Sequence, residues 1–257
     1  MKTRTLFLLF LLFSISVVGQ EVSINQDTIP QMRKNVIKFL PENLIFNSLS
    51  FEFERKFSPK SSFLLGVGLA SPKSFANKYN LNSSPDNVIS NDEFSIMSVR
   101  AAYRHYAGHH VRPVGFYFSP YLKYQKIAAK ANNHRTITEG FPAVTTQYDE
   151  KYDVKGNTLN FGIQWGVQFL IAKRLCIDFY FLGIEGGLAD VTAIVKSPNT
   201  IMIDKVESGV RENVDKLPSF LSSKIKVTRN GSDQVDVSGK SMPYPWLRSG
   251  ISIGLAF

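Results

Sequence analysis

The sequence predicts an all-β fold, an eight-stranded antiparallel transmembrane β-barrel with long external loops. Three observations predict it. Apolar and polar residues alternate in many short segments, as in strands with two different faces. Beyond residue 20 no helical stretch approaches the roughly twenty apolar residues that cross a bilayer. Short and long connections also alternate, and a closed barrel is the strand structure that satisfies its own backbone hydrogen bonds in lipid.

The N-terminus predicts export. Lys2 and Arg4 precede the apolar run Leu6–Phe13, and small residues near Gly19 suit cleavage by a signal peptidase. The run is shorter than the helix that a retained anchor, the alternative, would need. We therefore expect the protein in the outer membrane of a Gram-negative bacterium. The expected organisation is a signal peptide at 1–20, a periplasmic segment at 21–34 and the barrel at 35–257, with a long external insertion at 188–245.

Charge and cysteine content narrow the function classes. The formal charge of +9 suits contact with anionic lipid headgroups. Nucleic acid is the weaker interpretation, because the basic residues are scattered and no binding motif accompanies them. The single cysteine, Cys176, excludes an intramolecular disulfide. We expect no cofactor and no metal site.

Eight segments show the alternation of a strand. The clearest runs from Leu159 to Ile171, with aliphatic and aromatic residues on one face and amides and glycines on the other. Across the tight Ala172-Lys173 turn it forms a hairpin with the next segment. Pro120 predicts a bulge or strained pairing in its own strand, because proline lacks a backbone N–H. The other predicted strands are 36–40, 48–54, 62–69, 97–104, 116–124, 174–181 and 246–257.

The connections predict which ends of the strands are external. Short turns at 58–60, 107–113 and 172–173 are periplasmic in this scheme, and the turn at 41–43 is a short exception on the outside. The long external connections are 71–93, 131–156 and 188–245. The last contains an amphipathic helix at 203–223 broken at Pro218, and a hairpin, 225–228 with 234–237, around Asn230-Gly231. This insertion is either a lid or an external platform.

The alternation places a dense set of charges inside the barrel. Glu52 and Glu54 share one face and are candidates for a general acid and base. The favoured interpretation is a buried ion-pair network that fills a narrow interior, since unpaired charges there would be costly. Eight strands leave an interior filled by side chains, which argues against a general porin. The predicted lumenal charge network is Lys38, Glu52, Glu54, Arg100, Arg104, Lys123, Arg174, Asp178 and Arg248.

Residues at the two rims suggest contacts. Lys126, Lys130 and Arg135 flank an external strand end and are candidates to bind the phosphates of lipopolysaccharide. His105, His109 and His110 lie near a predicted periplasmic turn and His134 in an external loop, so no metal-binding spacing arises. Outward aromatic residues predict interfacial girdles. These are Tyr103, Tyr106, Phe116, Trp165, Phe169, Tyr244 and Trp246.

Short phrases of the chain resemble a known family. They are Asn35–Phe39, Leu49–Arg55, Gly66–Gly68 and Arg248–Gly254, and they are similar to phrases of small outer-membrane barrels typical of Bacteroidota, a group largely of unknown function. The architecture resembles OmpA- and OmpX-type barrels. A closing strand that carries Ile253, Leu255 and Phe257 is also similar to the signal by which the barrel-assembly machinery recognises its substrates. The resemblance implies a compartment and a fold more than an activity.

The expected function is that of an integral outer-membrane protein with a structural or surface-interaction role. The protein is expected to be a monomer and not an enzyme, with outer-membrane lipid, lipopolysaccharide and the barrel-assembly machinery as partners and no nucleic acid. One alternative is a lipid-modifying enzyme of the lipid A deacylase or acyltransferase type. Such an enzyme would need a Ser-His pair at the outer rim, and Ser119 has no neighbouring histidine in the predicted arrangement. The other alternative is a soluble lipocalin-like periplasmic carrier.

Overall fold

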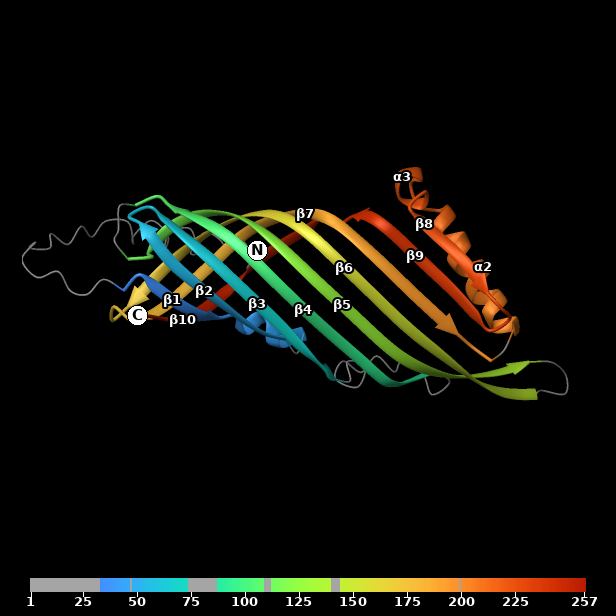
Figure 1. Ribbon diagram of the computed structural model, residues 1–257. Helices are drawn as coiled ribbons and strands as arrows, with labels where there is room; N and C mark the ends of the chain where they lie inside the picture. Colours follow the sequence, from blue (N-terminus) through green and yellow to red (C-terminus); the bar gives the residue numbers. More distant parts are fainter. Residues whose placement is uncertain (1–32, 47, 74–86, 109–111, 140–143, 199) are drawn as a thin grey trace, which may run out of the picture. The chain divides into compact units, whose positions relative to one another are not determined.

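The computed structural model describes residues 33–46, 48–73, 87–108, 112–139, 144–198 and 200–257 (Figure 1). The predicted signal peptide and the predicted periplasmic segment up to residue 32 lie outside the described residues. Within the described ranges, no helix combines the length and the apolar composition needed to cross a bilayer.

The described chain is all-β, as the sequence predicts. Its strands form one antiparallel sheet in the order β10-β1-β2-β3-β4-β5-β6-β7-β9-β8, and β10 also pairs with β7. This second pairing closes eight strands into a ring. The strands are β1 Asn35–Phe39, β2 Ser48–Ser58, β3 Ser61–Lys73, β4 Asn87–Tyr106, β5 Gly115–Glu139, β6 Val144–Ile171, β7 Leu175–Lys196, β8 Ile225–Asn230, β9 Gln234–Pro243 and β10 Trp246–Ala256.

The predicted strand number needs correction, because the described ranges contain ten strands. The two additional strands are the predicted hairpin, now β8 and β9, which joins the sheet since β9 pairs with β7 from Leu188↔Pro243 to Lys196↔Gln234. The helices before it are α2 Thr200–Asp215 and α3 Ser219–Ser222. Pro218 precedes α3, so the break in the predicted helix is confirmed.

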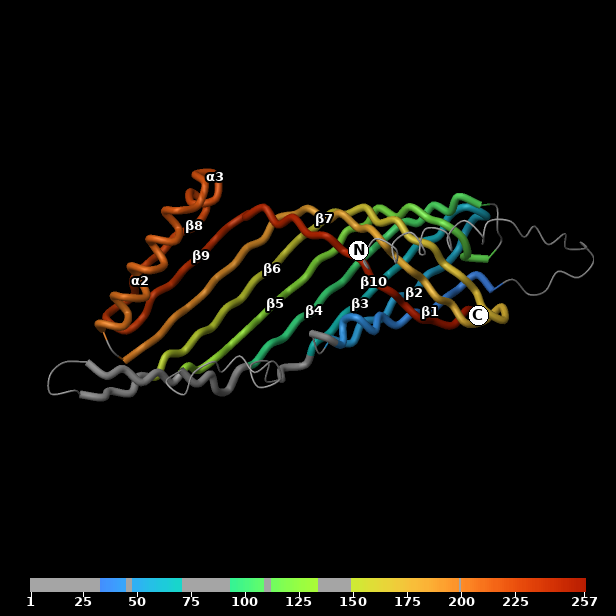
Figure 2. Tube along the Cα trace, turned by 180° about the vertical axis from the view of Figure 1, so that it is seen from behind, coloured from blue at the N-terminus to red at the C-terminus, as the bar shows by residue number. Residues whose placement is uncertain are grey.

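Strands extend into all three of the predicted long connections. β5 and β6 have 25 and 28 residues and pair continuously from Gly115↔Gln168 to Glu139↔Val144. The predicted connection 131–156 is therefore a continuation of both strands. β4 begins at Asn87 and β7 reaches Lys196, which shortens the other two connections in the same way. Figure 2 shows β4 to β7 running side by side far beyond β1 and β2.

A short strand closes the ring. β1 pairs Lys38 with Gly254 on β10 and with Glu52 on β2, which confirms the predicted partnership of the first and last strands. Gly254 permits this approach, because a Cβ atom there would lie 2.2 Å from the Ile37 carbonyl oxygen. After β1 the chain leaves the sheet as the 3-10 helix η1, Pro41–Phe46, which contacts both β2 and β10.

The sequence predicts irregular backbone at the Ala172-Lys173 turn and at Pro120. The Ala172-Lys173 turn has positive φ at both residues, 50° and 63°, which suits a two-residue hairpin between right-twisted strands. Of the two alternatives predicted at Pro120, a bulge or a strained pairing, the described β5 ladders contain no bulge there. Pro120 pairs in register with Ile163 on the β6 side. On the β4 side the ladder is interrupted between Ala102↔Tyr121 and His105↔Phe118 and resumes without a shift, so the pairing is disturbed at Pro120.

The bulge lies in β7 instead. The β6 residues Trp165 and Gly166 pair with Leu182 and Tyr180, so Phe181 is the extra residue and both Phe181 and Leu182 are exposed. Beyond this bulge the odd-numbered residues of β7 face inward, whereas the even-numbered ones face inward before it. One inserted residue therefore reverses the faces of the second half of β7.

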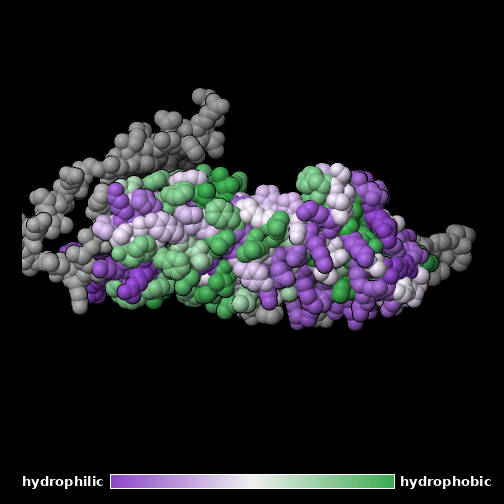
Figure 3. All heavy atoms as spheres, turned by 45° about the horizontal axis from the view of Figure 1, so that its top comes forward, coloured by the Kyte–Doolittle hydropathy of each residue, from purple (hydrophilic) through white to green (hydrophobic). Residues whose placement is uncertain are grey.

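The outward side chains of the ring form an apolar belt. On β2, exposed Leu49, Phe51 and Phe53 alternate with buried Ser50 and Glu52. Figure 3 shows hydrophobic side chains gathered over the ring and hydrophilic ones over the part of the sheet that carries α2 and β8. The apolar belt includes Ile37, Phe51, Phe53, Phe63, Leu65, Val67, Met97, Val99, Phe116, Phe118, Leu122, Tyr124, Leu159, Phe161, Phe179, Phe181, Ile184, Leu188, Ile253 and Leu255.

Candidate functional site

The interior of the ring is filled by an ion-pair core. Near the short turns, Lys38 Nζ lies 2.6 Å from Glu54 and 2.8 Å from Asp178. Arg104 Nη1 contacts the same two carboxylates at 3.4 and 2.7 Å. All four side chains are buried. Each cation therefore bridges two carboxylates, as burial of these charges requires.

Tyrosine and amide side chains complete the lower part of the core. The Tyr106 hydroxyl donates to Glu54, and the Tyr117 hydroxyl donates to Asp178 at 2.8 Å. Gln168 accepts a hydrogen bond from Arg104 at 2.8 Å. Each carboxylate thus accepts bonds from neutral donors as well as cations, and the remaining lone pairs are satisfied.

A second group of charges lies above the first. Arg100 is paired with Glu52, and Lys123 Nζ lies 3.1 Å from Glu185. Arg248 lies 3.9 Å from Glu52. The ion-pair core is hereafter Lys38, Glu52, Glu54, Arg100, Arg104, Lys123, Asp178, Glu185 and Arg248.

The core includes eight of the nine predicted charges. Arg174 differs from the prediction because it lies in the turn before β7, where its side chain is exposed. Glu185 was missed because the β7 bulge reverses the alternation between it and Asp178. The consecutive apolar pair Phe181-Leu182 is the signal that could have revealed this change of face.

The candidate catalytic residues are ion-paired or lie apart from one another in the described structure. Glu52 and Glu54, the predicted acid-base candidates, are each paired with an arginine, Arg100 and Arg104 respectively. Ser119 is buried inside the ring, whereas His105 is exposed on the outward face. His109 and His110 lie outside the described residues, as does the side chain of His134. Tyr106, predicted in an outward girdle, is buried and bonded to Glu54.

The long strands reverse their polarity beyond the belt. We call this part the extension: residues 87–96, 125–139, 144–158 and 189–196 with β8 and β9. On the face that continues the ring interior, cross-strand partners form two rows with apolar side chains or glycine throughout. The inner apolar rows are Ile96-Ile127-Gly156-Val191-Gly239-Ile225 and Phe94-Ala129-Val154-Ala193-Val237-Val227.

The opposite face of the extension is polar. Its intervening row includes Ser95, Lys155, Thr192 and Lys226. The belt has the reverse pattern, apolar outside and charged inside. The described extension therefore has the polarity of a sheet surrounded by water, with an apolar inner face.

Helix α2 lies on this inner face at its far end. Arg229 on β8 pairs with Val235, which pairs with Val195 on β7, so the three residues share one face. Arg229 Nη1 contacts Asp204 and Glu207 of α2. The α2 residues Met202 and Ile203 are buried, as are Val195 and Val235.

Ionic contacts hold α2 to the hairpin. Hydrogen bonds from Arg211, 2.9 Å away, and from Arg229 hold the pKa of Glu207 below its ordinary value. A hydrogen bond to Asp204 raises the pKa of Arg229. Both shifts favour the charged forms, so these contacts are strongest when every group is ionised.

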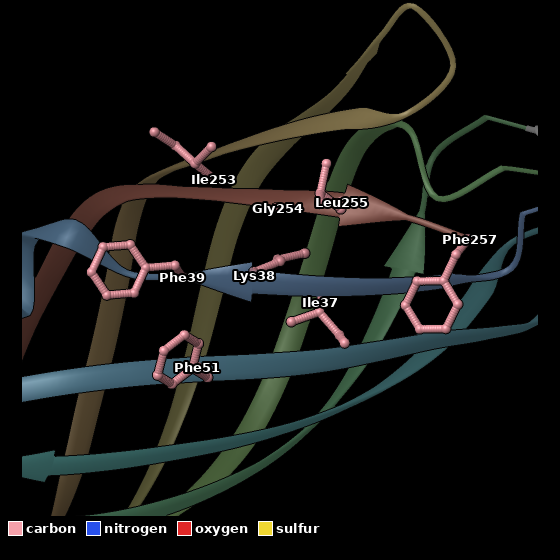
Figure 4. Close-up of a pocket in the computed structure, with 8 residues that line it drawn as sticks. All are labelled: Ile37, Lys38, Phe39, Phe51, Ile253, Gly254, Leu255 and Phe257. Atoms are coloured by element: carbon pink, nitrogen blue, oxygen red, sulfur yellow. The ribbon is translucent and has the colours of Figure 1, made fainter.

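Above β1, the wall of the ring is formed by a 3-10 helix in place of a paired strand. In the part of the chain described, β10 pairs with β1 only from Ile253 to Ala256, and η1 occupies the space between β2 and the remainder of β10. Glu42 of η1 accepts a hydrogen bond from Tyr180 inside the ring. Below η1, on the outer face, lies an apolar hollow of about 340 Å³ over the β1 seam (Figure 4). Its outward apolar side chains are Ile37, Phe39, Phe51, Ile253, Leu255 and Phe257.

The predicted contact residues lie on the outer surface where they are described. Lys126 is exposed immediately beyond the belt residue Tyr124, and Lys130 lies 3.8 Å from Glu93 on β4. Arg135 is on β5, with its side chain outside what the structure describes. Ile253, Leu255 and Phe257 are all exposed.

Comparison of the chain with protein-family models, with curated proteins and with solved structures gave no match.

Proposed function

We propose that the protein is an integral outer-membrane β-barrel that is closed to general diffusion and carries an external sheet for surface interaction. The observation that carries this proposal is the pairing of an apolar belt outside the ring with an ion-pair core inside it. A soluble protein would expose the charges and bury the belt. In lipid, the same arrangement satisfies both faces of each strand.

The extent of the belt supports a membrane crossing. On β5 the outward apolar residues run from Phe116 to Tyr124, and Lys126 follows. A tilted strand needs about 9–11 residues to cross the hydrocarbon layer. The extension then stands in water beyond the membrane, on the side away from the short turns.

The ion-pair core argues against a pore role. Lys38 and Arg104 join strands on opposite parts of the ring through Glu54 and Asp178. An interior of eight strands is narrow enough for side chains to fill. We therefore propose a non-enzymatic role in surface interaction rather than transport of small solutes.

The remaining expectations from the sequence extend the proposal. We infer export by the 1–20 segment, membership of the small barrels typical of Bacteroidota, and recognition of the strand bearing Ile253, Leu255 and Phe257 by the assembly machinery. We also infer that Lys126, Lys130 and Arg135 of β5 contact the phosphates of lipopolysaccharide.

Membrane fractionation tests the proposal. The full chain is expected in the outer-membrane fraction and to migrate faster in unheated than in heated gel samples. In planar bilayers we expect no steady conductance, because the core fills the ring. Recovery in the soluble periplasm would overturn the membrane assignment, and a stable open-channel current would overturn the closed interior.

A further inference from the structure

The inner apolar rows are incompletely covered within the described structure. Their side chains are mostly half-buried, neither as exposed as belt residues nor as buried as a core. Among the described helices, α2 reaches this face, and its contacts are with β8 and β9 at the far end. The rows on β4 to β7 lie between α2 and the ion-pair core. A continuous apolar surface that faces water is typical of a binding surface.

We propose that this inner face binds the hydrocarbon chain of a long-chain fatty acid, whose carboxylate meets Arg100 and Lys123 at the top of the ion-pair core. The inference rests on the proposed function, because the belt places the top of the core at the outer edge of the membrane. It adds the chemical class of the ligand that the extension holds.

The top of the core suits a single carboxylate. The ion pairs at this end of the core set three cations, Arg100, Lys123 and Arg248, against two carboxylates, Glu52 and Glu185. The Nε atom of Arg100 is buried and has no hydrogen-bond partner in the described structure. Lys123 and Arg248 retain partly exposed side chains, 19% and 16%. A small anion would supply the missing acceptor and offset the repulsion among the cations.

The inner face suits one extended acyl chain above that carboxylate. Lys123 pairs with Arg100, and on the same face of β5 the residues beyond it are Gln125, Ile127, Ala129 and Ala131. The distance along the strand from Lys123 to Ala131 is about 26 Å at roughly 3.3 Å per residue. The chain would therefore pass Gln125, cross both apolar rows and end near Ala131.

A lateral route to this face would lie in the wall above β1 and would be opened by a shift of η1. There η1, rather than a paired strand, separates the belt from the interior, and Glu42 is bonded to Tyr180 beside Arg248. The apolar hollow beneath η1 lies on the membrane side of the same seam. An amphiphile in the outer leaflet would thus have its head at the level of the three cations.

Adjacent residues on β7 provide a matched test. Ala193 belongs to an inner apolar row, whereas Thr192 is exposed on the polar face. The full chain is refolded, its folding is checked by heat-modifiable migration, and palmitate binding is counted by native mass spectrometry. We expect about one palmitate per chain. The affinity should be at least roughly tenfold weaker in Ala193→Asp and nearly unchanged in Thr192→Asp. The reason is that only Ala193→Asp places a charge against the hydrocarbon chain.

The binding of the fatty-acid carboxylate is tested separately with the substitution Lys123→Gln. This variant should weaken palmitate several-fold and leave hexadecanol, which has the same chain without the anion, unaffected. Phosphatidylglycerol serves as the two-chain competitor and should bind more weakly than palmitate.

Absence of bound palmitate on a folded chain, equal losses in the two β7 variants, or a preference for phosphatidylglycerol would overturn the inference. None of these results contradicts the proposed membrane barrel. Failure of the wild-type chain to enter membranes would instead overturn the proposed function.

Discussion

Arg104 Nη1 lies 2.7 Å from Asp178 Oδ2 across the interior of the ring, and both side chains are buried. The same carboxylate oxygen accepts a hydrogen bond from Lys38 at 2.8 Å, so Asp178 balances two cations that come from different strands. Because β1 contributes Lys38, β4 contributes Arg104 and β7 contributes Asp178, these contacts join three strands that are not neighbours in the ring.

Replacement of Asp178 by Asn should therefore destabilise the ring. The change leaves Lys38 and Arg104 buried with one carboxylate, Glu54, between them. Removing one partner of a buried ion pair costs about 3–5 kcal/mol. Urea unfolding in lipid vesicles measures the change in the free energy of unfolding.

Asp190→Asn is the matched control, since Asp190 is an exposed residue of the same strand. It should change the unfolding free energy by less than about 0.5 kcal/mol. Equal stability of Asp178→Asn and the wild type would contradict the role assigned to the ion-pair core.

The Tyr180→Phe substitution should loosen η1. It removes the hydroxyl that donates to Glu42 and leaves that buried carboxylate without the bond. Hydrogen exchange at residues 41–46 should accelerate several-fold, while exchange in β3 stays unchanged. The comparison variant is Tyr124→Phe, which alters an outward tyrosine on the belt. If both variants exchange alike, η1 is held by its contacts with β2 and β10 and not by this bond.

Lipopolysaccharide association should depend on three cations of β5, of which Lys126 lies at the outer edge of the belt and Lys130 and Arg135 lie farther along the extension. The triple substitution Lys126→Ala, Lys130→Ala and Arg135→Ala is expected to lower co-purified lipopolysaccharide several-fold, because phosphate contacts by lysine and arginine are lost. Quantification of bound lipid A phosphate measures it. Replacing Lys205, Lys216 and Lys224 near α2 removes the same charge elsewhere and should have little effect. An unchanged lipopolysaccharide content in the first variant would refute the contact.

The strands of the ring were predictable because successive residues face different surroundings, the outer surface and the charged interior. Phe53 is exposed on the outer surface and Glu54 is buried in the interior, so a few residues are enough to show the alternation of a strand. The alternation predicts that Lys38 and Glu54 point inward, and in the structure Lys38 Nζ lies 2.6 Å from Glu54 Oε2. Which cation meets which carboxylate was not predictable, because the strand register decides it.

The extension escaped prediction for the opposite reason. On β5, outward Leu122 and Tyr124 are even-numbered, whereas inward Ile127 and Ala129 are odd-numbered. The apolar parity changes without a bulge, as the proposed change of surroundings from lipid to water requires. A prediction that follows one apolar face therefore ends the strand where the belt ends, although the backbone ladder continues.

Acid should release α2 from the hairpin. The pKa of Glu207 is lowered in the folded chain by its hydrogen bonds from Arg211 and Arg229, so its contribution to stability is fully present above the unfolded value, about 4.3. As the pH falls through the lower folded pKa, Glu207 is protonated and that contribution is lost. A nitroxide attached at Ser208→Cys on exposed α2 should become more mobile between pH 6 and pH 3, over roughly the range of that titration. Glu207→Gln should be mobile already at pH 6 and change less with pH. Uniform mobility of the wild-type label across this range would show that apolar contacts of Met202 and Ile203, and not the ionic contacts, hold the helix.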